Sequence, residues 1–152
     1  MSRLRKAWSV TVKGGCGMAE IVYAPSAGRA RMDTFRTLSD VWSEVRVVDI
    51  VVRRAAERDV RLPDRDPIAD QLSDAERNCL LHAFGADQGD PTKAGYRDYF
   101  YTRRDDPPLV ALTDRSLMAP MSGDKWGKDM TYFVLTSEGK RVAESLLPEY
   151  RP

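Results

Sequence analysis

Apolar and polar positions alternate in the first segment of the chain. Trp8, Val10 and Val12 share one side, while polar or charged residues occupy the positions between them. A period of two is typical of a strand with one buried face. A glycine-rich turn at residues 14–17 and a second alternating run at 20–23 follow, so the pattern predicts a β-hairpin.

A helix and a third strand are expected next. Ser26 suits the N-cap of a helix, and spaced apolar residues carry the helix from 27 to about 39. The β-branched run from 45 to 52 predicts a largely buried strand, with a helix as the competing interpretation because residues 42–56 contain neither Gly nor Pro. The expected N-terminal unit is therefore ββαβ, over residues 1–57.

Residues 58–72 differ in composition from the segments on either side. They are rich in charge, include Pro63 and Pro67, and contain few apolar residues. This composition is typical of a linker, so we expect a boundary between two modules here and a second domain over residues 73–152.

The second half predicts helices around a hairpin strand. Ser73 and Glu76 have the spacing of a capping box, in which each side chain accepts a hydrogen bond from the other residue's backbone N–H. The helix that follows should stop at Gly85. The further elements expected are a helix beginning at Pro107-Pro108, a strand over 131–135 and a last helix capped by Thr136 or Ser137.

This order of elements resembles the winged-helix domain. Leu112-Thr-Asp-Arg-Ser-Leu-Met118 is similar to the end of that domain's third helix, and Leu135-Thr-Ser-Glu-Gly139 to the segment leaving the wing. A ββαβ segment before such a half also resembles small bacteriophage and prophage proteins. The resemblance implies an α+β fold, in which a small N-terminal ββαβ unit precedes a degenerate winged-helix domain.

The domain is called degenerate because the DNA-reading part departs from the winged-helix pattern. Residues 95–104 are aromatic and strand-like where a second helix would stand. The helix that would read DNA begins after Asp105 and Asp106, whose carboxylates would repel phosphates.

The composition and net charge of the chain limit the classes of protein to which it can belong. With 42% apolar residues the 152-residue chain is too apolar to be wholly disordered, and it has no apolar run of about 18 residues to span a membrane. The N-terminus has no apolar segment of the secretory type, so a cytoplasmic location is expected, in the host cell if a phage encodes the protein. The net charge of +1 does not indicate a nucleic-acid binder.

Candidate chemistry for catalysis or metal binding is sparse. Two Cys and one His cannot supply a four-ligand zinc site, and both thiols are expected to be free. Cys79 and His82 lie three residues apart, but no oxyanion-donor motif accompanies them. We therefore expect no enzyme activity, no catalytic residues, no metal and no cofactor.

Cationic and aromatic clusters are the candidate binding residues. Residues 1–57 hold ten Lys and Arg against six Asp and Glu, which indicates either a merely solvated surface or a docking surface for nucleic acid or an acidic protein. A turn that places Trp between two Lys, and a run of Tyr and Arg, are either interface anchors or packed against their own domain. The candidates are Arg29, Arg36, Arg53, Arg54, Arg97, Tyr99, Tyr101, Arg103, Arg104, Lys125, Trp126 and Lys128.

Two functions are consistent with these features. The first is a non-enzymatic binding protein of phage or prophage type that contacts a host nucleic-acid-handling or defence complex, as an anti-CRISPR or anti-restriction-like inhibitor does. The alternative is a winged-helix DNA-binding transcriptional regulator, as a homodimer. The near-zero net charge and the Asp105-Asp106 pair favour the first.

Overall fold

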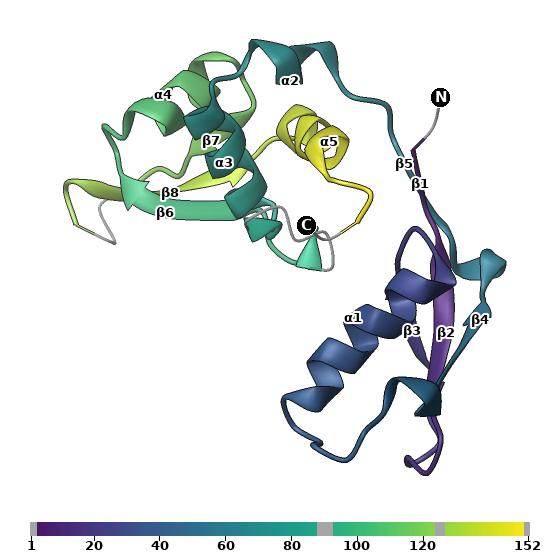
Figure 1. Ribbon diagram of the computed structural model, residues 1–152. Coiled ribbons are helices and arrows are strands. Elements are labelled where there is room, and N and C mark those ends of the chain that lie inside the picture. The colour runs from purple at the N-terminus through teal and green to yellow at the C-terminus, as the bar shows by residue number, and fades with distance from the viewer. Residues whose placement is uncertain (1–2, 88–92, 124–126, 151–152) are drawn as a thin grey trace. The chain divides into compact units, whose positions relative to one another are not determined.

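The computed structural model describes residues 3–87, 93–123 and 127–150, and the fold is α+β (Figure 1). The chain divides into two compact units, one from Ser2 to Arg61 and one from Leu62 to Pro152. The N-terminal unit holds twelve Lys and Arg against seven Asp and Glu, whereas the C-terminal unit holds twelve against sixteen. The two units are therefore of opposite net charge.

The N-terminal unit is a three-stranded antiparallel sheet with one helix. The strands are β2 (Ala7–Val12), β3 (Glu20–Tyr23) and β4 (Ile50–Arg54), in the order β3-β2-β4. Helix α1 (Ala27–Ser39) covers one face of this sheet (Figure 1) and is capped by the Ser26 hydroxyl, as the sequence predicts. The short strand β1 (Arg3–Arg5) precedes β2 and pairs with β5 (Val60–Leu62).

The β-branched run at residues 45–52 is only partly a strand, contrary to expectation. A short 3-10 turn occupies Val47–Asp49, and β4 begins at Ile50. Across this turn Arg46 donates two hydrogen bonds of 3.0 and 3.1 Å to Asp49, and Val48 is 69% exposed. The apolar β-branched run therefore begins before the strand, and only its last residues, from Ile50 onward, pair with β2.

A small core lies between α1 and the sheet. Val10, Val45 and Ile50 are buried there, with Phe35 and Trp42 packed against them. The Arg31 guanidinium on α1 donates to the Ile50 carbonyl at 3.1 Å. The helix is thereby attached to the sheet by a hydrogen bond as well as by apolar contact.

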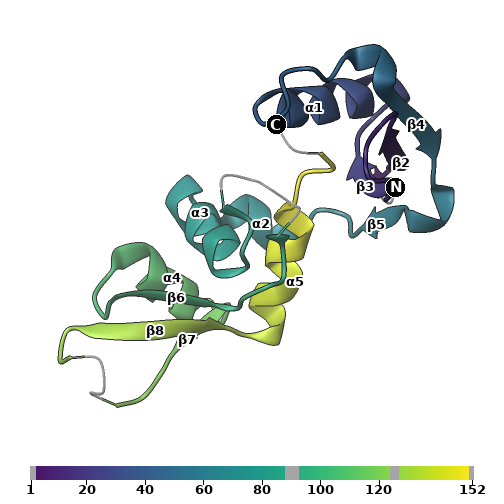
Figure 2. The same ribbon diagram turned by 90° about the horizontal axis from the view of Figure 1, so that it is seen from below.

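The C-terminal unit places helices around a second antiparallel sheet. Strands β6 (Tyr99–Arg103), β7 (Met118–Pro120) and β8 (Met130–Leu135) have the order β6-β8-β7. Its helices are α2 (Pro67–Gln71), α3 (Asp74–Ala83), α4 (Pro107–Asp114) and α5 (Ser137–Leu146). In Figure 2, α3 and α4 lie on one side of β6 and β8.

The helix starts predicted from the sequence are confirmed. Ser73 Oγ accepts from the Glu76 N–H at 3.2 Å, and the Glu76 carboxylate accepts from the Ser73 N–H at 2.6 Å, which completes the capping box. Pro107 and Pro108 occupy the first turn of α4, and Thr136 caps α5. The capping side chains accept hydrogen bonds from backbone N–H groups that the start of a helix leaves without partners. The prolines have no N–H group that would need one.

The segment 58–72 is ordered and is not the structureless linker that its composition suggests. Asp66 caps α2 by accepting from the Ile68 N–H at 2.9 Å, and its buried carboxylate also pairs with Arg141 of α5. Ala69 and Leu72 are buried in the core of the C-terminal unit. The charge and proline that suggested a linker instead start a short helix and attach it to α5.

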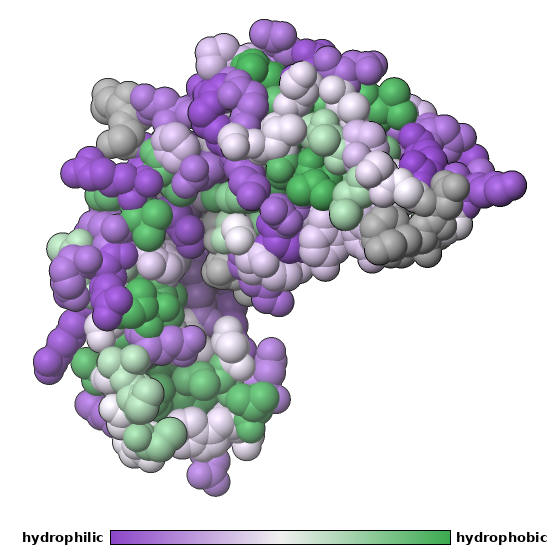
Figure 3. Space-filling model, turned by 180° about the vertical axis from the view of Figure 1, so that it is seen from behind, coloured by the Kyte–Doolittle hydropathy of each residue, from purple (hydrophilic) through white to green (hydrophobic). Residues whose placement is uncertain are grey.

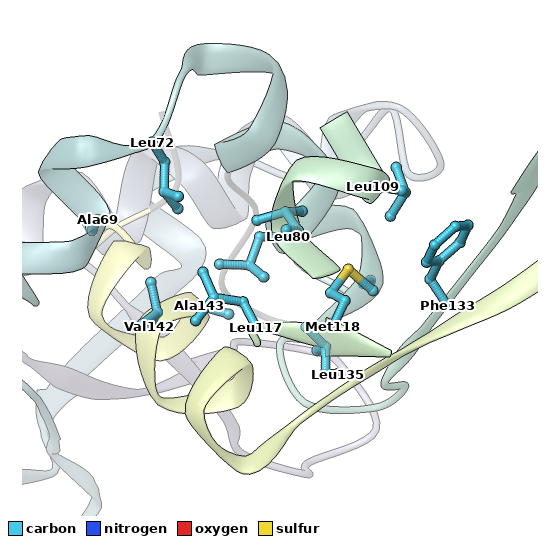
Figure 4. Packing of buried hydrophobic residues seen from close by; sticks show 12 residues of the cluster. Ala69, Leu72, Leu80, Leu109, Leu117, Met118, Phe133, Leu135, Val142 and Ala143 are labelled. Carbon is cyan, nitrogen blue, oxygen red and sulfur yellow. The ribbon is translucent and has the colours of Figure 1, made fainter. Parts of the chain in front are cut away.

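The core of the C-terminal unit receives side chains from four helices and two strands (Figure 4). Its fully buried members include Leu80, Leu112, Leu117 and Phe133. At about 25 cal/mol per Å² of apolar surface removed from water, each such side chain contributes on the order of 2 kcal/mol. This cluster supplies the main stabilisation of the unit.

The ends of α4 and β8 meet at the Leu117 carbonyl. Ser116 ends α4 in the left-handed region with φ 60°, and the Leu117 N–H donates to the Leu112 carbonyl at 2.9 Å. The Thr136 N–H donates to the Leu117 carbonyl at 3.1 Å, and Gly139 of α5 is packed directly against that carbonyl. A Cβ at Gly139 would overlap the oxygen and lie 2.9 Å from the carbonyl carbon.

We expect Gly139→Ala to destabilise the C-terminal unit by about 3 kcal/mol, because backbone would have to move to admit the methyl group. The free energy of unfolding, measured by urea denaturation and by amide exchange within the unit, tests this. Gly28→Ala is the matched control, since Gly28 also lies in the first turn of a helix but is exposed, with only Ser26 Oγ within 4.0 Å. That change should stabilise α1 by about 0.5–1 kcal/mol. Equal effects at the two positions would contradict the packing described for Gly139.

Candidate binding surface

Several apolar residues reach the surface of the protein. In the view of Figure 3, hydrophobic atoms form separate patches among polar ones on both units. The exposed large apolar side chains of the C-terminal unit are Tyr96, Tyr99, Tyr101, Val110 and Met121. Tyr99 and Tyr101 are neighbours on one face of a strand, which makes that face the candidate site.

Three tyrosine rings contact one another on the outer face of β6 and β8. Tyr132 lies between the two rings of β6, with ring centroids 5.5 Å from Tyr99 and 4.7 Å from Tyr101. Tyr99 is 45% exposed and Tyr101 42% exposed. The name tyrosine face is used below for these three residues together with Ala119, Met121, Met130 and Val134, which share the outer side of the sheet by register.

Strand alternation produces this face. Along β8, residues 131, 133 and 135 are buried while the residues between them are half-buried. Phe100 of β6 pairs with Phe133 of β8, so these two rings turn toward the core while their tyrosine neighbours turn away from it. Antiparallel register then places Tyr101 opposite Tyr132.

The charges at the rim of the tyrosine face are paired within the protein. Arg103 donates two hydrogen bonds of 2.9 Å to Asp105, which raises the pKa of Arg103 and lowers the pKa of Asp105. Lys140 lies 3.2 Å from Asp98. Arg103 is exposed and remains a rim candidate, but its charge is offset by its neighbour.

Arg104, one of the expected partner-binding residues, forms hydrogen bonds within its own unit. Its guanidinium donates to the Gly123 carbonyl at 2.6 Å and to the Lys128 carbonyl at 3.1 Å. Its own N–H donates to the Asp129 carbonyl at 2.8 Å. These bonds hold both sides of the β7–β8 connection to the end of β6.

Arg97 is likewise engaged internally, contrary to expectation. The guanidinium donates to the His82 carbonyl at 2.6 and 2.8 Å and to Asp87 at 3.0 Å, and its side chain is only 17% exposed. It also lies over the ring of Tyr96, 5.3 Å from the centroid. Arg97 thus links the C-terminal end of α3 to the segment that precedes β6.

The expected wing tip is only partly described. Lys125 and Trp126 lie outside the described residues, so the prediction for them stays untested. Lys128 is exposed, and its carbonyl accepts from Arg104.

The basic residues of the N-terminal unit do not form the one surface that the sequence suggested. Arg29 and Arg36 lie on α1 on either side of Asp33, at 2.9 and 3.7 Å from its carboxylate. Arg54 donates to both carboxylate oxygens of Asp59, at 2.6 and 2.5 Å. Arg53 points from the other face of β4 and, among the described residues, makes no ion pair.

The Cys79 and His82 pair has the wrong chemistry for a nucleophile. Burial, with a smaller effect of Asp106, raises the pKa of the Cys79 thiol to about 11, whereas a nucleophilic cysteine requires a lowered pKa. The His82 ring packs on Phe100, 4.5 Å between centroids, and its Nδ1 contacts Asp87. Within the described ranges no three His, Cys, Asp or Glu residues are grouped so that they could hold a metal ion.

Tyr132 belongs to the site but was not among the residues expected there. The sequence predicted a strand over 131–135, but Tyr132 to Leu135 form a continuous apolar and aromatic run that does not show which residues face outward. What the sequence did not reveal is its pairing partner, because register between distant strands is set by the whole fold.

Comparison of the chain with protein-family models, with curated proteins and with solved structures finds no match. In the part of the chain that the structure describes, no helix has the length and apolar character needed to cross a membrane.

Arg103 and Arg104 allow a matched test of the two roles described for neighbouring arginines. Arg104→Ala should destabilise the C-terminal unit by about 1–2 kcal/mol and increase amide exchange around residues 121–130, because it removes two bonds to carbonyls. Arg103→Ala should leave stability nearly unchanged, since both partners of its ion pair are exposed. Thermal unfolding and hydrogen exchange measure both effects. A larger effect at Arg103 would contradict the assignment.

The Arg54–Asp59 pair predicts an acid-dependent stability of the N-terminal unit. Hydrogen bonds from Arg54 and from the Ala7 N–H lower the pKa of Asp59 to about 2 from its ordinary 3.8. Because the unfolded chain binds this proton more readily, the stabilisation is complete above a pH of about 4 and is lost as the pH falls toward about 2. Urea denaturation followed by β2 amide signals should therefore show a steeper acid loss in the wild type than in Asp59→Asn. Parallel pH profiles would show that the pair does not stabilise the unit.

Proposed function

We propose that the chain is a non-enzymatic binding protein that docks a protein partner through the tyrosine face. The observation that carries the proposal is the group of three contacting tyrosines on the outer side of β6 and β8. Tyrosine supplies a large rigid contact area and a hydroxyl that can hydrogen-bond, and it is enriched where proteins bind one another. Apolar neighbours Val134 and Met121 extend the same face.

Charge favours a protein over a nucleic acid as the occupant of this face. The C-terminal unit has four more acidic than basic residues. The described rim cations Arg103 and Lys140 are each held by a carboxylate. Nucleic-acid binding draws most of its affinity from cations that neutralise phosphates, and this rim offers little net positive charge.

The alternative of a winged-helix DNA-binding regulator has weaker support. The order of helices and strands and the sheet order β6-β8-β7 are compatible with it. However, α4, which would read DNA, contains no Lys or Arg, and its exposed positions include Pro107, Val110 and Asp114. A helix in the major groove reads bases through hydrogen-bonding side chains, which these residues largely lack.

An inhibitor of a host nucleic-acid-handling or defence complex, as the resemblance to phage proteins implies, is a specific form of this proposal. Such an inhibitor needs a stable docking surface and no catalytic group. The tyrosine face fits the first requirement, and the raised pKa of Cys79 is consistent with the second.

Replacing both exposed tyrosines of β6 tests the proposal. The double variant Tyr99→Ser, Tyr101→Ser should reduce capture of the partner about tenfold or more, because aromatic residues at the centre of an interface dominate its affinity. The measurement is quantitative mass spectrometry of proteins captured by the immobilised full chain from nuclease-treated lysate of the source cells.

Val110→Ser is the matched control, because Val110 is 39% exposed on α4 and lies outside the tyrosine face. A partner captured by the wild type and by this control, but not by the double variant, supports the proposal. Capture that is equal in all three proteins would show that the tyrosine face is not the docking surface. Analytical ultracentrifugation of the same proteins distinguishes a second copy of the chain as the partner.

A further inference from the structure

The N-terminal sheet has a second face, opposite α1, that is lined by two small polar residues, two basic residues and the apolar residues Ile21 and Val51. In the register of the sheet, Ser9 of β2 lies between Ile21 of β3 and Arg53 of β4, and Thr11 lies beside Val51. Lys13 continues the same alternation, and its N–H donates to the Asp49 carbonyl at 2.8 Å. These six side-chain positions, 9, 11, 13, 21, 51 and 53, are called the open sheet face below.

The open sheet face carries positive charge. Lys13 and Arg53 are exposed, and neither makes an ion pair within the described residues. The carboxylate at this end of the sheet is Asp49, which already accepts two hydrogen bonds from Arg46. The N-terminal unit as a whole has five more basic than acidic residues.

Hydroxyl groups lie between these cations. Ser9 and Thr11 are half-buried, and within the described residues their hydroxyls make no hydrogen bond to the protein. Both can donate to a phosphate oxygen, as Ser and Thr commonly do at a DNA backbone. The face thus offers donors and charge without an aromatic anchor, since the ring of the nearby Tyr23 is covered by the Arg5 guanidinium at 4.5 Å.

We propose that the open sheet face binds the phosphate backbone of double-stranded DNA. Charge complementarity carries this proposal, which concerns a different unit and a different partner from the tyrosine face. A single-stranded nucleic acid is disfavoured, because its sites rely on exposed aromatic rings for stacking. An acidic protein is less favoured because the face has no exposed aromatic ring, and its exposed large apolar residue, Ile21, is only 36% exposed.

The test is binding of the full chain to a fluorescein-labelled DNA duplex of mixed sequence, measured by anisotropy over a range of salt concentrations. Affinity should fall with salt, and Lys13→Ala and Arg53→Ala should each weaken binding and reduce the slope of log affinity against log salt by about 0.9. The double variant Ser9→Ala, Thr11→Val should weaken binding with the slope unchanged, because it removes donors but no charge.

Arg36→Ala is the matched control, because Arg36 lies on α1, on the covered side of the sheet, with a side chain 67% exposed. It removes the same charge from the same unit and should leave the salt slope unchanged. Circular dichroism confirms that each variant is folded, and the tyrosine variants Tyr99→Ser, Tyr101→Ser should bind DNA as the wild type does.

Three results would overturn the proposal. One is an absence of duplex binding at low salt, and another is an Arg36→Ala effect as large as that of Arg53→Ala. The third is competition by polyglutamate that matches unlabelled duplex at equal charge, which would assign the face to an acidic protein. None of these results bears on partner capture by the tyrosine face, so the two proposals can fail separately.

Discussion

The contact between the Leu117 carbonyl and the start of α5 is the constraint on which the C-terminal unit depends. It brings together two connections that are separated along the chain, the one from α4 to β7 and the one from β8 to α5. Ser116 has to adopt φ 60° to turn the carbonyl toward Thr136, and residue 139 has to lack a Cβ to let α5 approach it. Once these conditions are met, β8 is directed between β6 and β7, and the core residues Leu117, Met118 and Leu135 face one another.

The outer surface of the same sheet follows from this arrangement. With α3 and α4 packed against the inner side, the tyrosine rings of β6 and β8 remain at the surface, where they contact one another. Arg104 holds the connection between β7 and β8, so the edge of the surface is defined by hydrogen bonds to backbone carbonyls. The two neighbouring arginines therefore have different roles. Arg104 stabilises the sheet, whereas Arg103 is exposed at its rim.

Sequence patterns predicted the elements whose determinants are local. The Ser73–Glu76 capping box, the prolines of α4 and the strand composition of residues 131–135 each act within one element, and each was recognised. The start of α2 was missed although Asp66-Pro67 is a local helix-start signal, because the surrounding charge was taken as a sign of a linker. The pairing of Tyr101 with Tyr132, and the internal bonds of Arg97 and Arg104, depend on contacts between distant segments, which no local pattern contains. The sequence thus named Tyr99 and Tyr101 within a mainly cationic set of candidates, but not the surface that they form with Tyr132.

Buried and half-buried side chains alternate along the six residues of β8, and the two sets are constrained differently. Thr131, Phe133 and Leu135 are constrained by the volume of the core, so substitutions there lower the free energy of unfolding. Tyr132 and Val134 are half-buried on the outer side of the sheet, where a change of side-chain size leaves the volume of the core unchanged. A strand of this kind lets the specificity of a surface diverge rapidly while the scaffold beneath it stays the same. Changes at every second residue of this one strand would thus alter the outer surface of the sheet and leave the core residues as they are.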